Sequence, residues 1–120
     1  MVVAQARAAK IRVSSFSSIL TEVAMQVGGD RVEVTGHVKP GTDPHDFEPR
    51  ASDLKAVSNA DLVLLSAKHL EGYVGKLRDV TKAKIVEVGD SFPSLKLTVQ
   101  HGDHAHEGED PHWWHSVKNI

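Results

Sequence analysis

The stretch DLVLLSA, residues 61–67, holds four large apolar residues in a row between an aspartate and two small residues. A nearly continuous apolar run of this length is typical of a strand that is covered on both faces. Such strands belong to parallel sheets whose two faces carry helices. The stretch therefore predicts a buried strand in an α/β fold.

Other short segments around this run also read as strands. Period-two patterns predict strands over 10–16 and 31–38, and KIVEV predicts one over 84–88. Between these segments, apolar residues recur at helical spacing and predict helices, the last of them near 71–81. The chain order is then βαβαβαβ. This order favours an α/β fold with a four-stranded, mainly parallel sheet and helices on both faces.

Capping residues give the expected limits of the first two helices. The first helix has Ser15 or Ser17 as a possible N-cap and ends at Gly28-Gly29. The second is expected to begin at Ser52, a good N-cap candidate, with Asp53 near the positive end of the helix dipole.

Composition limits the classes of function. The 120 residues fit one small domain, and 14 basic against 16 acidic residues give a net charge of -2 without a basic stripe. A nucleic-acid partner is therefore disfavoured. The chain has no cysteine, so a bound metal must be held by His, Asp or Glu. No apolar run approaches the roughly 20 residues of a membrane-spanning helix, and we expect peripheral membrane contact only.

The N-terminal residues 1–9 are expected to be a flexible remnant ahead of a domain over 10–120. Residues 2–9, VVAQARAA, contain A-x-A-like spacings and resemble the end of a secretory signal whose hydrophobic part is missing. The alternative is a floppy N-terminus behind a cloned start methionine.

Histidines concentrate where the parallel strands are expected to end. In open parallel sheets, ligands bind at the carboxyl ends of the strands. The loops predicted at that edge are 39–49, 67–71 and 89–115. Up to residue 112 they contain His45, His69, His101, His104, His106 and His112. His37, near the end of a strand, is expected to be a packing or surface residue.

Two of these loops repeat the triplet Asp-Pro-His. PGTDPHDFEP (40–49) contains His45, and EDPHWW (109–114) contains His112. Neutral imidazole is a common ligand of divalent transition metals, and a neighbouring carboxylate can orient its second nitrogen. One triplet alone reads equally well as a proline-rich turn with an exposed histidine. Two at one edge predict ligands that converge from separate parts of the chain.

The residues GGDRVEVTGHVKPGTDPHDFEPRASDLKAVSNADLVLL, followed by DPHWW, resemble the N-terminal lobe of the zinc- or manganese-binding substrate-binding proteins of bacterial ABC importers. The resemblance runs from about residue 10 to the end. It implies that His45 and His112 are metal ligands, and that the histidine-rich segment at about 100–110 is a loop that gathers metal. Members of this family are roughly twice as long, and a second lobe, absent here, supplies their remaining ligands.

Four other histidines are weaker candidates. His69 is either an added ligand or an exposed loop residue, and the neighbouring Glu71 is expected to start a helix. His101, His104 and His106 form an H-x-x-H-x-H pattern, which can chelate a divalent ion without any fold. The alternative is a solvated linker.

These observations favour capture of Zn²⁺, with Mn²⁺ as the lesser option, for delivery to an ABC permease. The protein would then be periplasmic, or extracellular and either lipid-anchored or secreted, and it would not be an enzyme. We also expect homodimerisation through the exposed surface of the lobe or its C-terminal segment, because an isolated lobe exposes apolar surface.

Two other classes remain as alternatives. A zinc-dependent hydrolase would use Asp46, Glu48 or Glu109 as general base, but the sequence has neither H-E-x-x-H nor G-x-S-x-G. A nucleotide-binding sheet would need a glycine fingerprint after its first strand, where this chain reads SSFSS.

Overall fold

The main sheet consists of four parallel strands. The computed structural model describes residues 8–101 and 104–120, and side chains in these ranges except over 99–106. The strands lie in the order β2-β1-β3-β4, and every neighbouring pair is parallel. Their bounds are β1 (Ile11–Ser15), β2 (Val32–Gly36), β3 (Leu62–Leu65) and β4 (Lys84–Glu87). The predicted parallel α/β sheet is confirmed.

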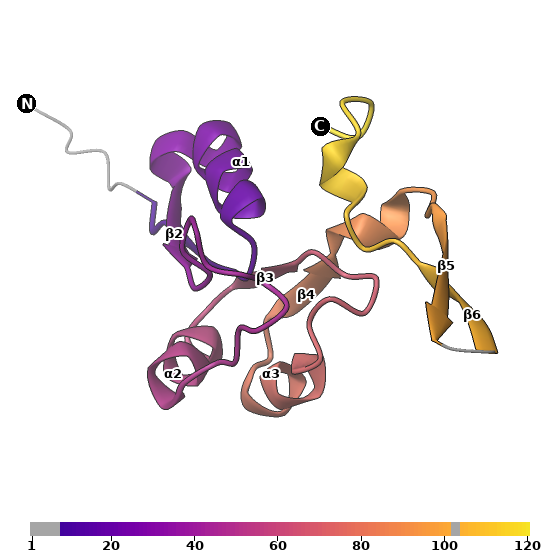
Figure 1. Cartoon of the computed structure of the whole chain (residues 1–120). Helices are drawn as coiled ribbons and strands as arrows, with labels where there is room; N and C mark the ends of the chain where they lie inside the picture. Colours follow the sequence, from indigo (N-terminus) through magenta and orange to yellow (C-terminus); the bar gives the residue numbers. More distant parts are fainter. Residues whose placement is uncertain (1–7, 102–103) are drawn as a thin grey trace, which may run out of the picture.

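Helices cover both faces of this sheet, as predicted. In Figure 1, α1 (Ser18–Gly28) lies on one side of the sheet, and α2 (Ala51–Ser58) and α3 (Val74–Val80) lie together on the other. The apolar residues of β3 explain this arrangement, because Val63 and Leu65 are fully buried between the sheet and the paired helices. A fully covered central strand requires helices on both sides.

The core lies between the sheet and the α2–α3 layer. Six buried side chains form one cluster there: Phe16, Val57, Val63, Leu65, Tyr73 and Leu77. Strand β3 and helices α2 and α3 each contribute at least one of them. The cluster therefore ties the strand ends that carry the functional loops to two helices.

The helix ends follow side-chain and glycine capping, with one correction. The Ser17 hydroxyl accepts the Leu20 N–H at 3.3 Å at the start of α1, and Gly29, with φ of 52°, ends the helix as predicted. Helix α2 begins at Ala51, so the prediction of Ser52 as its N-cap is wrong. The Asp53 carboxylate accepts the Arg50 N–H at 2.8 Å and makes the stabilising contact at this end instead.

The segment predicted as a histidine-rich loop at about 100–110 is an antiparallel hairpin, which corrects the prediction. Strands β5 (Lys96–His101) and β6 (His104–Glu109) pair from Lys96↔Glu109 to His101↔His104. The sequence of β6, HAHEGE, has little strand propensity of its own. It forms a strand because pairing with β5 satisfies its backbone groups.

The base of the hairpin is fastened to the main lobe. The Asp110 N–H donates to the Leu95 carbonyl at 2.8 Å and closes the two strands where they leave the lobe. The buried Lys68 ammonium donates to the Phe92 carbonyl at 2.8 Å and to the Ser94 hydroxyl. The hairpin therefore starts and ends at one fixed point (Figure 1).

Short 3-10 turns complete the fold. They are η1 (Gly29–Arg31), η2 (Val88–Ser91) and η3 (Trp113–His115). Of the predicted N-terminal remnant 1–9, residues 1–7 lie outside the described part of the chain. No helix among the described residues has the length and apolar character needed to cross a bilayer.

Candidate metal centre

His45 and His112 meet at the carboxyl edge of the sheet, although 67 residues separate them. Their Nε2 atoms lie 3.3 Å apart, and their ring planes cross at 61°. At a zinc–nitrogen distance of about 2.0–2.1 Å, two ligands at a tetrahedral angle lie roughly 3.3–3.4 Å apart. The spacing of the two nitrogens is therefore that of two ligands of one ion.

Both histidines are held by the same local structure. The Asp43 carboxylate accepts the His45 N–H at 2.9 Å, and the Asp110 carboxylate accepts the His112 N–H at 2.9 Å. Each aspartate thus closes a turn onto the backbone two residues later. The proline between them fixes φ and removes a competing donor. The repeated triplet is a repeated turn that presents an imidazole.

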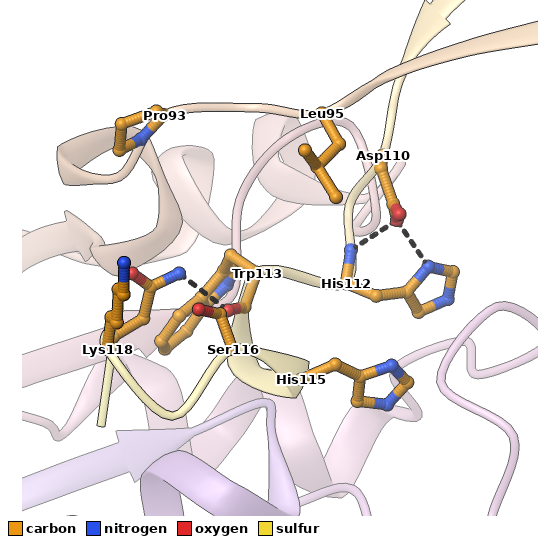
Figure 2. A pocket seen from close by; sticks show the side chains of 9 residues that line it. Pro93, Leu95, Asp110, His112, Trp113, His115, Ser116 and Lys118 are labelled. Atoms are coloured by element: carbon orange, nitrogen blue, oxygen red, sulfur yellow. Dashed lines mark hydrogen bonds and ion pairs between the residues drawn. The ribbon is translucent and has the colours of Figure 1, made fainter.

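The second turn has an additional contact, which fixes the His112 ring. The Asp110 Oδ1 atom lies 2.6 Å from His112 Nδ1 (Figure 2). A carboxylate at Nδ1 holds the proton there and leaves the Nε2 lone pair free for a metal. The hydrogen bonds from the backbone and ring of His112 hold the pKa of Asp110 below its usual range, so this carboxylate stays ionised at neutral pH.

Trp113 anchors the second turn to the sheet. Its indole N–H donates to the Ser66 carbonyl at 3.0 Å and to the Ser66 hydroxyl at 2.9 Å. The ring stacks on Phe92 at 4.9 Å and is buried. Gly89 allows this approach, because a Cβ at that position would lie 2.6 Å from Trp113 Cδ1. Trp113 is therefore a core residue.

Glu71 holds the loop that receives this tryptophan. The prediction that Glu71 starts a helix is wrong, because α3 begins at Val74. Its buried carboxylate accepts the N–H groups of Ser66 at 2.5 Å and Ala67 at 2.9 Å. Burial raises the pKa of Glu71, although these hydrogen bonds act in the opposite direction. Three residues of this loop have positive φ, Ala67, Lys68 and His69, a conformation that side chains make costly.

Among the other predicted ligands, only His69 has a described side chain. His69 is exposed, and no contact joins it to His45 or His112 in the described part of the chain. The side chains of His101, His104 and His106, at the end of the hairpin, lie outside the described residues. Among the side chains that are described, no group of three His, Asp or Glu residues is placed to hold a metal ion.

His37 is a packing residue, as predicted. Its ring is buried, stacks on Phe16 at 4.5 Å, and lies 2.7 Å from Asp53 and 3.1 Å from Ser14 through its two nitrogens. Partial burial raises the pKa of Asp53, but the hydrogen bonds from Arg50 and His37 outweigh this effect and lower it. Both nitrogens of His37 are occupied, which leaves no atom for a metal.

The carboxylates that a hydrolase would need lie elsewhere. Glu48 pairs with Lys76 at 3.5 Å, and Glu109 accepts the Ser94 hydroxyl at 3.2 Å. Within the described residues, no hydrogen bond or ion pair joins Asp46, Glu48 or Glu109 to either histidine of the pair.

Comparisons with known proteins agree with a metal-binding lobe. Residues 13–120 match the family described as "ZnuA: Zinc-uptake complex component A periplasmic". This α/β lobe, with ligand-type histidines at the carboxyl edge of its sheet, therefore belongs to that family.

Individual relatives and structures show the same kind of similarity. The "Manganese-binding lipoprotein MntA" of Halalkalibacterium halodurans is 38% identical over 109 residues, which cover 90% of this chain and 34% of that protein. The "Manganese ABC transporter substrate-binding lipoprotein PsaA" of Streptococcus pneumoniae is 32% identical, with 92% and 37% covered. The structure of the "periplasmic zinc binding protein TroA from Treponema pallidum" has a TM-score of 0.77 at 26% identity, with 92% and 39% covered.

Two points follow from these relatives. The chain spans about a third of the length of the curated relatives that it matches, 34% and 37%. By their names, both relatives are metal-binding or substrate-binding lipoproteins, which agrees with the prediction that the chain is not an enzyme. The hydrolase alternative has no support from them.

Proposed function

We propose that this lobe binds a divalent transition metal as cargo, with His45 and His112 as its ligands. The observation that carries the proposal is the 3.3 Å separation of the two Nε2 atoms. The matching Asp-Pro-His turns and the carboxylate on His112 Nδ1 support it. Two imidazoles supply half of a tetrahedral zinc shell, and the other positions stay open for water or further ligands.

Zinc is the proposed cargo, with manganese as the competitor. Imidazole nitrogens suit zinc, whereas manganese prefers carboxylate and other oxygen ligands. The relatives named above bind manganese in two cases and zinc in one, by their names. A competition titration separates the two ions, because a 100-fold excess of manganese should leave zinc in place if two imidazoles dominate the site.

The proposed context is uptake through an ABC importer. One relative is named as the substrate-binding lipoprotein of such a transporter. We propose the same role here, with a permease as partner, peripheral contact with the membrane, and a periplasmic or extracellular location, lipid-anchored or secreted. His101, His104 and His106 are a proposed weak metal-gathering group on the hairpin, whereas His69 is proposed to be an exposed loop residue and not a ligand of the pair.

Association of two copies through the C-terminal segment is also proposed. Three apolar side chains near that segment are strongly exposed, Leu95 at 74%, Val117 at 89% and Ile120 at 73%. Clustered exposed apolar surface favours association. Light scattering from micromolar to millimolar concentration tests this, and a constant monomer mass would contradict it.

Isothermal titration with zinc tests the main proposal. The wild-type chain is compared with the His45→Ala/His112→Ala variant, both stripped of metal beforehand, and the hairpin histidines are left intact in each. Loss of the tightest site in the variant supports the pair as the binding site. Unchanged affinity would assign binding to the other histidines and reject the proposal. The His37→Gln variant is not a suitable control, because His37 is part of the core.

A further inference from the structure

A second imidazole lies against the His112 ring. The rings of His112 and His115 are stacked, with centroids 5.5 Å apart and an interplanar angle of 15°. The spacing in sequence explains the stacking. The His115 N–H donates to the His112 carbonyl at 3.1 Å in the 3-10 turn η3, and residues i and i+3 eclipse in a 3-10 helix.

The two stacked rings differ in how their nitrogens are used. In His112, Nδ1 contacts Asp110 and Nε2 contacts His45. His115 is exposed, and no hydrogen bond or ion pair to other described residues engages its ring nitrogens. Trp114 contacts the ring only edge to face, at 5.6 Å and 79°. His115 therefore carries free metal-binding atoms beside a ligand-type histidine.

Both rings open onto the same space. Asp110, His112, Trp113 and His115 line one open pocket of about 360 Å³, and Figure 2 shows the rings of His112 and His115 projecting to the same side of the turn. In the present rotamers no third donor joins the pair. An exposed histidine changes rotamer within nanoseconds, so the His115 side chain is free to reorient within this pocket.

We propose that His115 is a third metal-contacting residue, which closes on an ion already held by His45 and His112. This inference rests on the proposed function, because the ion must first bind to the pair. With His115 the lobe provides three imidazoles, the number found in some open zinc sites, and one position remains for water or another ligand. The lobe then retains metal through its own side chains.

A phenylalanine at position 115 separates coordination from stacking. His115→Phe keeps a flat ring on His112 but has no donor nitrogen, whereas His115→Ala removes both. His69→Ala is the matched control, since it removes an exposed loop histidine that has no contact with the pair. Circular dichroism confirms that each variant is folded.

Two readouts on the full chain test the proposal with zinc below one equivalent, so that only the tightest site fills. Removing even a residue that only orients a ligand costs 10–100-fold in affinity, so we expect His115→Phe to weaken zinc binding roughly tenfold or more. X-ray absorption at the zinc edge should count one imidazole fewer in His115→Phe than in the wild type. His69→Ala should match the wild type in both readouts.

Different results would contradict the role of His115 and the proposed function of the pair. If His115→Phe binds zinc as tightly as the wild type with the same number of imidazoles, His115 does not contact the metal and the proposal is wrong. The same conclusion follows if only His115→Ala loses affinity, because His115 would then be a stacking partner. If His45→Ala/His112→Ala retains the tightest zinc site, the proposed function fails together with this inference, whereas failure of the inference alone leaves the pair intact.

Discussion

The two Asp-Pro-His turns have the same backbone contact but differ in the further contacts that hold each histidine in place. In both turns the aspartate accepts the histidine N–H at 2.9 Å. His45 has no further anchor from its own turn in the described part of the chain, and it is exposed. His112 is held by Asp110 at Nδ1 and is followed by the buried Trp113. If the pair holds an ion as proposed, His112 is already oriented for it, whereas the His45 ring is free to adjust.

This difference gives the turns separate tasks. A fixed imidazole defines where the ion sits and which nitrogen binds it. A mobile imidazole on an exposed loop reaches the ion with little strain. The comparison predicts that damage to the second turn lowers affinity more than equal damage to the first.

The largest effect should come from removing the anchor of the second turn. Trp113→Ala deletes a buried ring and its hydrogen bonds to Ser66, and large aromatic-to-alanine changes in a core cost about 3–5 kcal/mol. Urea unfolding measures the loss of stability. Trp114→Ala, at a half-buried neighbour, is the matched control and should cost clearly less. Equal losses in the two variants would show that Trp113 is not a special anchor.

The next effect separates the two aspartates. Asp110→Asn weakens the contact that holds the proton on His112 Nδ1, and changes of this kind cost 10–100-fold in metal affinity. Asp43→Asn alters only a turn contact to the His45 backbone, and its affinity should fall by less than roughly threefold, since asparagine closes such turns as well. Zinc titration of both variants measures the ratio. A larger loss in Asp43→Asn would reverse the comparison.

A smaller effect concerns Glu71, which holds the loop under Trp113. Because its pKa is raised in the folded protein, the folded state binds more protons than the unfolded state between the ordinary value of about 4.3 and the raised one. Stability from this group therefore falls as pH rises through that interval. Glu71→Gln should remove this slope while lowering stability overall, because the two N–H groups bond to different carboxylate oxygens and glutamine replaces one of these with an NH2 donor. Urea midpoints across pH 4 to 7 measure the slope, and an unchanged slope in the variant would contradict the assignment.

The smallest effect is expected at the loop between the turns. His69 is exposed and separate from the pair, so His69→Ala should change zinc affinity by less than roughly twofold, about 0.4 kcal/mol. A tenfold loss on titration would instead make His69 a ligand, which is one of the two possibilities that the sequence left open. It would also add a third chain segment to the site.

Strong local patterns were sufficient to predict the sheet and the pair. The run 62–65 predicted a covered parallel strand, and the repeated triplet at one sheet edge predicted that His45 and His112 converge. Both inferences rest on patterns that repeat over several residues. They also rest on a topology rule that orders the strand ends.

The parts that were missed depend on partners far away in sequence. Strand β6 forms only because β5 pairs with it. The role of Glu71 depends on the N–H groups of a loop with three positive φ values, which no residue type there indicates. No sequence pattern singles out His115, because its stacking on His112 depends on the 3-10 turn η3. Local propensity carries no information about such contacts.

The closed base of the β5–β6 hairpin makes the metal pair independent of the length of the hairpin. Because Leu95 and Asp110 are joined by a 2.8 Å hydrogen bond, residues 96–109 leave and return at one point. Insertions, deletions or exchanged histidine content beyond that bond leave the position of His112 unchanged. If the hairpin gathers metal and the pair holds it, as proposed, the first property can therefore change without a change in the second.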